Sequence, residues 1–187
     1  MRAVLISINP KWCEKIANGE KTIEVRKSRP KLETPFKVYI YCTRPYTASS
    51  DDRFYIYPND KPRNVAGCVI GEFVCDKIDE YKYRLTTYEG TPDKGKYISK
   101  EELVKTCLSI GEINDYLNGK NGCFWYISDL KIYDKPKYKS DFRKPCPYTD
   151  DTHCLENKCE HYSDYNGNCY YRVEKSPQSW CYVEVSE

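Results

Sequence analysis

The sequence lacks any long apolar run. The first apolar stretch, in MRAVLISINPKW, ends at Pro10 and Lys11, which is too early for the hydrophobic region of a secretory signal peptide. No other stretch approaches the roughly 20 apolar residues that a membrane-spanning helix needs. We therefore expect a cytoplasmic protein with no membrane partner.

Strong net charge and nucleotide-loop motifs are missing as well. The formal net charge is only +2 over 187 residues, so a basic footprint for nucleic acid would have to be local. Neither common glycine-rich phosphate loop is present, and we expect no organic cofactor. His153 and His161 lie together near the C-terminus, which argues against histidine-based catalysis elsewhere in the chain.

The sequence is instead rich in strand patterns. Its 19 tyrosines suit half-buried sheet faces and wet binding surfaces, because one end of the ring is apolar and the other polar. Helix starts are indicated at Asn9–Pro10, Ser99–Glu102 and Ser109–Glu112 by an N-cap followed by proline and by two capping boxes. There is no regular alternation of strands with long helices. The pattern predicts an α+β fold, a mixed β-barrel with short flanking helices. The expected strands are residues 3–8, 19–26, 36–42, 66–78, 123–133 and 179–185.

A segment dense in Cys, His, Asp, Asn and Tyr precedes the last of these strands. We interpret residues 144–172 as an insertion within a single domain of residues 1–187, because a strand after an irregular segment most simply returns to the main sheet. The cysteine count is odd and no export signal is visible, so we expect reduced thiols.

The insertion holds enough thiols for a structural zinc ion. Four thiolates would complete a tetrahedral site, and metal binding would explain how a segment with so little apolar content becomes ordered. The spacing lacks the paired C-x-x-C pattern of strong zinc motifs, so free cysteines, disulfides or another metal remain alternatives. The predicted zinc ligands are Cys146, Cys154, Cys159 and Cys169, and the remaining cysteines are predicted to be small buried hydrophobic residues.

Residues 19–26, GEKTIEVR, pose the main functional question. Strand alternation places Glu24 and Arg26 on one face and Lys21 on the other, unless the strand begins with a twist after Gly19. Exposed, the Glu24–Arg26 pair would be surface decoration; in a cleft, it would present a fixed acceptor and a forked donor to a ligand.

Basic residues and an aromatic ring lie close to this segment in sequence. Arg26, Lys27 and Arg29 form a basic cluster, and Trp12 lies on the preceding predicted helix. Cations beside stackable rings suit single-stranded nucleic acid or an extruded base. The alternatives are a solvated basic surface and, for Trp12, ordinary core packing at helical spacing.

The stretch SINPKWCEKIANGEKTIEVR resembles the start of the ASCH domain family. The family's G-x-K-x-x-E-x-R pattern is matched by Gly19, Lys21, Glu24 and Arg26. Residues 66–78 and CFWYISDLKIYDKP are similar to longer ASCH proteins from bacterial and prophage genomes. The resemblance implies a PUA-like barrel whose cleft is lined by the motif residues, in a superfamily whose related domains bind RNA or modified bases.

The resemblance also implies two possible activities. The first is binding of RNA or a modified nucleoside or nucleotide through Trp12, Lys21, Glu24, Arg26, Lys27 and Arg29. The second is a hydrolase, either an N4-acetylcytidine amidohydrolase or a ribonuclease, with Lys21 and Glu24 as catalytic residues. The deacetylating members use a threonine where this chain has Glu24, a departure that favours binding over a threonine-nucleophile reaction. Whether the protein is an enzyme stays open at this point.

Overall fold

The computed structural model describes residues 2–44, 53–56, 61–82, 98–145, 162–163, 168–169 and 171–185. Within these ranges no helix is long and apolar enough to cross a bilayer. The helices are α1 (Pro10–Ala17), α2 (Lys100–Thr106), α3 (Ile110–Leu117) and the 3-10 helix η3 (Lys139–Asp141). The strands are β1 (Arg2–Ile8), β2 (Ile23–Arg26), β3 (Phe36–Cys42), β4 (Tyr55–Ile56), β5 (Arg63–Asn64), β6 (Val69–Tyr81), β7 (Gly122–Lys137), β8 (Tyr162–Ser163), β9 (Asn168–Cys169) and β10 (Trp180–Glu184).

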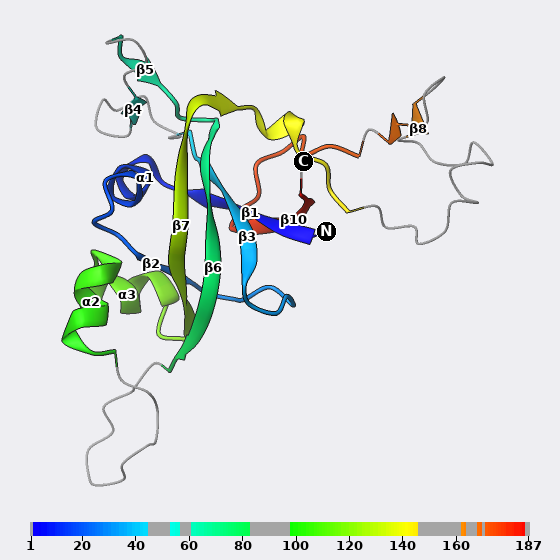
Figure 1. Cartoon of the computed structure of the whole chain (residues 1–187). Coiled ribbons are helices and arrows are strands. Elements are labelled where there is room, and N and C mark those ends of the chain that lie inside the picture. Colours follow the sequence, from blue (N-terminus) through cyan, green and yellow to red (C-terminus); the bar gives the residue numbers. More distant parts are fainter. Residues whose placement is uncertain are drawn as a thin grey trace, which may run out of the picture.

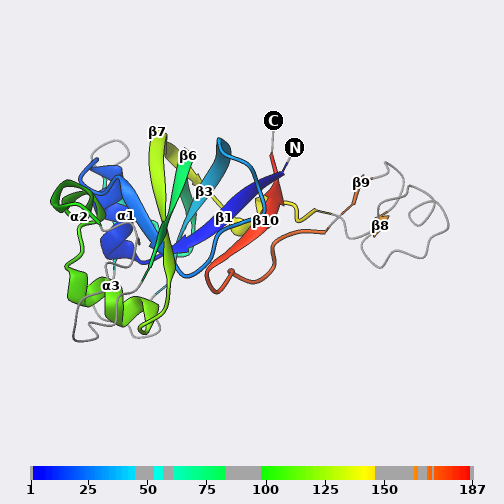
Figure 2. The same ribbon diagram turned by 90° about the horizontal axis from the view of Figure 1, so that it is seen from below.

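Six strands form one mixed sheet in the order β10-β1-β3-β6-β7-β2. Strands β1 and β3 pair in parallel, and every other pair in this sheet is antiparallel. The long strands β6 and β7 run across β1, while β10 lies beyond β1 at the edge of the sheet, so the sheet is strongly curved (Figures 1 and 2). This confirms the expected α+β class and the return of the last strand to the main sheet.

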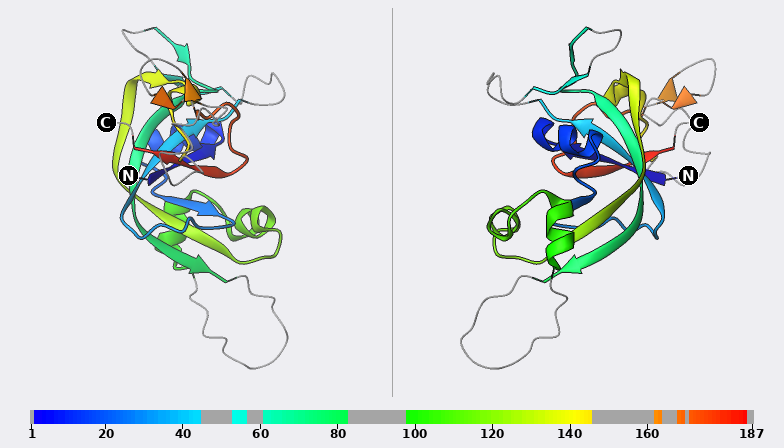
Figure 3. Two further views of the ribbon diagram at one scale, coloured as in Figure 1. Left: turned by 90° about the vertical axis from the view of Figure 1, so that its right-hand side faces the viewer. Right: turned by 60° about the vertical axis from the view of Figure 1, so that its left-hand side comes forward.

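The pairing order does not close on itself within the described part of the chain. Strands β10 and β2 are its two ends, and no strand ladder joins them. The structure therefore shows a curved mixed sheet, whereas the closed barrel stays a prediction. Figure 3 shows the strands curving around α1, with α2 and α3 beside β2.

The main core lies between the concave face of the sheet and α1. It includes Ile6 of β1, Ile16 of α1, Ile40 of β3 and Trp125 of β7, all fully buried. A second cluster lies on the other side of β1 and β3, where Phe142 packs on Tyr39 with ring centroids 4.7 Å apart. A third cluster fixes α3 against β2 and β7. Burial on both faces explains why β1 and β3 are almost continuously apolar.

The sequence signals for the helix starts are confirmed. Asn9 Oδ1 accepts a hydrogen bond from Lys11 N, with Pro10 as the first helical residue. Both predicted capping boxes are formed, with Ser99 and Ser109 as the N-caps of α2 and α3. These caps satisfy donors that would otherwise lack partners at each helix start, so short helices begin at defined residues.

The ends of the predicted insertion lie close together. Lys144 N donates to Tyr171 O over 2.7 Å, and Arg143 bridges Arg172 in antiparallel register. Between them only the backbone of the hairpin β8–β9 is described. The division into one domain with an insertion at 144–172 stays a prediction, because most of that segment lies outside the described residues.

Candidate ligand-binding site

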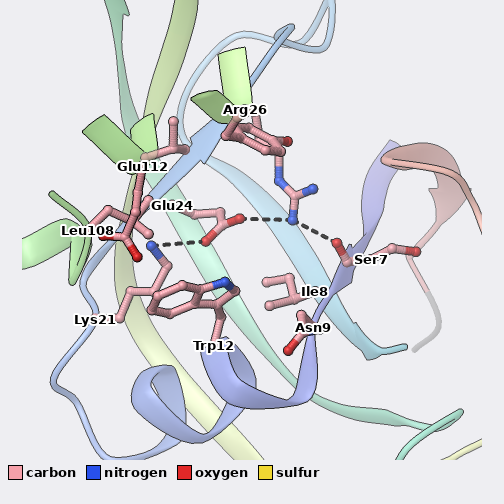
Figure 4. Close-up of a pocket in the computed structure, with 11 residues that line it drawn as sticks. Ser7, Ile8, Asn9, Trp12, Lys21, Glu24, Arg26, Leu108 and Glu112 are labelled. Atoms are coloured by element: carbon pink, nitrogen blue, oxygen red, sulfur yellow. Dashed lines mark hydrogen bonds and ion pairs between the residues drawn. The ribbon is translucent and has the colours of Figure 1, made fainter. Parts of the chain in front are cut away.

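A cavity of about 360 Å³ opens where α1, α3 and the strands β1 and β2 meet (Figure 4). This volume lies within the usual range for small-molecule sites. The cavity contains the motif residues Lys21, Glu24 and Arg26 together with Trp12. It is also lined by Ser7, Ile8, Asn9, Val25, Leu108, Glu112 and Tyr116.

The end of α1 determines where Lys21 lies. Gly19 has a φ of +74°, a left-handed conformation that suits glycine after a helix. The backbone N–H groups of Glu20 and Lys21 both donate to Lys15 O, so the chain continues to wrap around the helix end. Strand β2 therefore begins only at Ile23, and Lys21 lies before it. The exception allowed for a twist after Gly19 therefore applies, and strand alternation does not separate Lys21 from Glu24.

Glu24 links two cations in the floor of the cavity. Its Oε2 lies 3.3 Å from Lys21 Nζ, and its Oε1 lies 2.9 Å from Arg26 Nη2. The three side chains are almost fully buried. Removing ions from water costs several kcal/mol each, and this cost is offset only where geometry and further hydrogen bonds are good. We refer to Lys21, Glu24 and Arg26 together as the buried triad.

Lys21 uses its donors within the protein. Nζ donates to Ile23 O over 2.9 Å and to Thr106 O over 2.7 Å, in addition to its ion pair with Glu24. Thr106 is the last residue of α2, where free carbonyl groups and the helix dipole favour a cation. Since an ammonium group has three donors, Lys21 has none to spare for a ligand.

Arg26 connects β2 with β1, two strands that are not paired with each other in the sheet. Its Nη2 donates to Ser7 O of β1 over 2.7 Å while also pairing with Glu24. The Nε atom is buried and has no hydrogen-bond partner among the described residues. Arg26 is thus a structural bridge between β2 and β1 as well as a lining residue.

Two aromatic side chains stand at the wall of the cavity. Trp12 of α1 is half-buried against the main core, and Tyr116 of α3 is 39% exposed. A lysine lies near each ring: Lys11 Nζ is 4.6 Å from the Trp12 ring centroid, and Lys27 Nζ is 5.2 Å from that of Tyr116. Trp12 packs on the core as expected and also lines the cavity, and its role in stacking stays a prediction.

The sequence predictions covered part of this lining. Lys27 contacts the Tyr116 ring without lining the cavity itself, and Arg29 is exposed and does not line it either. Glu112 and Tyr116 were missed, although the capping box at Ser109 had already indicated their helix. Hydrogen bonds from the backbone N–H and hydroxyl of Ser109 lower the pKa of Glu112, which places a carboxylate at the edge of the site.

The side chains of the predicted zinc ligands lie outside the described part of the chain. Cys146, Cys154 and Cys159 lie outside the described residues, and only the backbone of Cys169 is described. Zinc in the insertion stays a prediction, for which elemental analysis would give about one ion per chain. The seven cysteines whose side chains the structure describes are free. Cys13, Cys42, Cys75 and Cys123 are buried as expected, whereas Cys68, Cys107 and Cys181 are only partly buried.

Comparison with known proteins identifies the fold. The sequence matches no protein-family model and no curated protein at a significant level. The structure is similar to the ASCH protein of Zymomonas mobilis, with a TM-score of 0.51, 16% identity, and coverage of 97% of this chain and 87% of that chain. Two single-residue variants of that protein give TM-scores of 0.53 and 0.51 at 16% identity, again over 97% of this chain and over 90% and 88% of theirs. The chain has the fold of an ASCH domain, as its sequence motif implied.

Proposed function

We propose that this protein binds a single nucleobase, either presented by RNA or carried by a modified nucleoside or nucleotide, in the cavity between α1, β2 and α3. One observation carries the proposal: the cavity combines stackable aromatic walls with a buried carboxylate that two cations hold in place. The ASCH fold and the PUA-like barrel that the sequence motif implies support it further, since that superfamily includes binders of RNA and modified bases.

The shape of the site suits a flat polar ring. Trp12 and Tyr116 offer rings for stacking, an interaction that is worth about 1–3 kcal/mol per base. Glu24 is fixed by Lys21 and Arg26, so its remaining lone pairs present acceptors for the N–H groups on a base edge. A fixed acceptor costs no reorganisation when the ligand arrives, and this preorganisation favours selectivity for bases that carry amino or imino donors.

The hydrolase alternative has less support. Lys21 is 2% exposed and directs its ammonium group at two backbone carbonyls and Glu24. A lysine that activates water or binds a developing oxyanion needs a free donor or lone pair facing the substrate. Catalysis through Lys21 and Glu24 would therefore require the buried triad to rearrange. Incubation of the protein with N4-acetylcytidine, followed by chromatography for cytidine, tests this alternative directly.

Fluorescence titration tests the binding proposal. The chain has three tryptophans, and Trp12 lines the cavity, so a stacked base is expected to quench emission in wild-type protein and much less in Trp12→Phe. A panel of nucleosides, N4-acetylcytidine among them, would be titrated, followed by short RNA oligonucleotides. If no nucleoside and no oligonucleotide binds saturably, the proposal is wrong.

Tyr116→Ala gives the sharper test, because this side chain is largely exposed and its loss should leave the fold intact. We expect roughly tenfold weaker binding, as removal of one stacking ring predicts. Tyr55→Ala is the matched control: Tyr55 is 37% exposed against 39% for Tyr116 and lies on β4, away from the cavity lining. Equal losses in the two variants would argue against the cavity as the binding site.

A further inference from the structure

A second feature of the molecule is an excess of positive charge at the far end of β7. Residues 131–144, which we call the basic band, comprise the end of β7, η3 and the residues that follow. The band contains six cationic side chains and two carboxylates, an excess of four charges in a chain whose formal net charge is +2. The cations are Lys131, Lys135, Lys137, Lys139, Arg143 and Lys144.

The cations of the basic band are available to a partner. None of them forms an ion pair within 4 Å with any residue that the structure describes. Lys131, Lys135 and Lys137 are exposed. Of the two carboxylates, Asp141 already accepts a hydrogen bond from Tyr138 N over 2.8 Å. Lys131 lies opposite Glu72 and helps to lower the pKa of that carboxyl, whereas the other cations of the band have no carboxylate within 4 Å among the described residues.

Aromatic rings are interleaved with these cations. Lys137 Nζ lies 5.1 Å from the Tyr133 ring centroid and 6.0 Å from that of Phe142. Lys144 Nζ lies 5.4 Å from the ring centroid of Tyr171. Tyr138, in the middle of the band, is 62% exposed. Cations beside rings, with one ring free to stack, are the combination by which proteins bind single strands.

The basic band is also firmly held. Lys131 lies opposite Glu72 of β6, and Phe142 is buried against Tyr39. Val173 N donates to Phe142 O over 3.0 Å, and this pairing continues to Arg143 and Arg172, which face each other. The basic band is therefore an ordered part of the fold, packed on β3 and β6.

We propose that the basic band is a docking surface for the phosphate backbone of single-stranded nucleic acid. The lysines of β7 neutralise phosphates, and Tyr138 stacks on a base. This end of β7 is bulged, because Ile132 pairs with Gly71 and Lys137 with Val69, so its lysines lie within a short stretch of the strand. This surface is distinct from the cavity, and the inference does not require that the cavity binds a base.

A charge-reversal experiment tests this surface. Binding of a fluorescein-labelled single-stranded 20-nucleotide RNA would be followed by anisotropy over a series of salt concentrations, with the full chain. The triple variant Lys131→Glu, Lys135→Glu, Lys137→Glu is expected to lose at least 100-fold in affinity at low salt. The slope of log Kd against log salt concentration should fall by about 2, because each lost phosphate contact on a single strand removes about 0.7.

The control is a triple variant with the same change in net charge. Lys82, Lys100 and Lys120 are exposed lysines outside the basic band, and none of them forms an ion pair with a described residue. Changing all three to Glu should alter affinity by only a few fold. Equal losses in the two triple variants, or an unchanged salt slope in the basic-band variant, would overturn the proposal.

Two further measurements separate this inference from its alternatives. The basic-band variant should bind nucleosides as wild type does. Tyr116→Ala should keep the wild-type slope of log Kd against log salt concentration. The cavity proposal and the basic-band proposal can therefore be rejected independently. If the basic-band variant loses binding to vesicles containing phosphatidylserine but keeps its affinity for RNA, a membrane surface replaces nucleic acid as the partner and the proposal is wrong. If the Glu variant does not fold, the same three lysines changed to Gln provide the test.

Discussion

The buried triad and the basic band hold similar charges in opposite settings. In the triad, Lys21 and Arg26 direct their donors at Glu24 and at backbone carbonyls, and all three side chains are almost fully buried. In the basic band, Lys135 and Lys137 are exposed and form no ion pair with a described residue. The first arrangement fixes a geometry, and the second leaves charge for a partner to neutralise.

This difference changes what each region is expected to do. A buried, internally satisfied set of ions can position one carboxylate for a ligand, but its cations contribute little to long-range attraction. Exposed unpaired lysines do the reverse, since they attract polyanions in a salt-dependent way and select weakly among sequences. Selectivity is therefore expected to reside in the cavity, and affinity for a strand in the basic band.

Breaking the triad should produce the largest effect. Glu24→Gln leaves two buried cations facing each other without their shared counter-ion, and we expect a loss of about 3–5 kcal/mol in the free energy of unfolding. Urea denaturation would measure it. The exposed pair Lys15–Glu20, with 2.8 Å between Nζ and Oε2, is the contrasting case, and Glu20→Gln should change the urea midpoint little. A small effect of Glu24→Gln would contradict the buried, coupled geometry of the triad.

The next largest effect concerns the support of the basic band. A Cβ added to Gly71 of β6 would clash with Lys131 O and lie 3.1 Å from Ile132 Cα, so the backbone of β7 would have to move. Gly71→Ala should therefore cost about 1–3 kcal/mol in the free energy of unfolding and weaken RNA binding through the basic band.

Gly111→Ala in α3 is the matched control for this substitution. The nearest atom to its added Cβ is Ser109 Oγ at 3.9 Å, so no clash arises. Alanine also favours the helix, and we expect a gain of up to about 1 kcal/mol. If the two alanine variants had the same urea midpoint, close packing of β6 on β7 at Gly71 would be ruled out.

Much of the fold could be predicted from local sequence signals. The N-cap at Asn9, the capping boxes at Ser99 and Ser109 and the final strand were all visible, because each depends on residues close together in the chain. The strand after Gly19 was predicted too long. Its first residues instead complete the end of α1 by donating to Lys15 O, and an alternation argument has no meaning outside a strand.

The candidate site was predictable only in part. Lys21, Glu24 and Arg26 could be grouped because they are neighbours in a recognisable motif. Thr106 and Tyr116 come from helices far later in the chain, and only folding brings Thr106 to Lys21 and Tyr116 to the cavity. For the basic band, the charge excess can be read from the sequence. Which of its lysines lack ion-pair partners depends on side-chain positions in the fold.

The smallest expected effect comes from the carboxylate next to the basic band. Although desolvation raises the pKa of Glu72, hydrogen bonds from Tyr133 and Lys37 outweigh it and lower that pKa overall. A lowered pKa in the folded state gives stability that is present above the unfolded value of about 4.3 and is lost as pH falls through the folded value. Glu72→Gln should therefore lower the unfolding free energy by about 1 kcal/mol at pH 7 and by less near pH 3. Urea midpoints at the two pH values would measure this, with exposed Glu80→Gln on the same strand as control. A deficit that persists unchanged at pH 3 would mean that packing, and not charge, is what Glu72 contributes beside the lysines of the basic band.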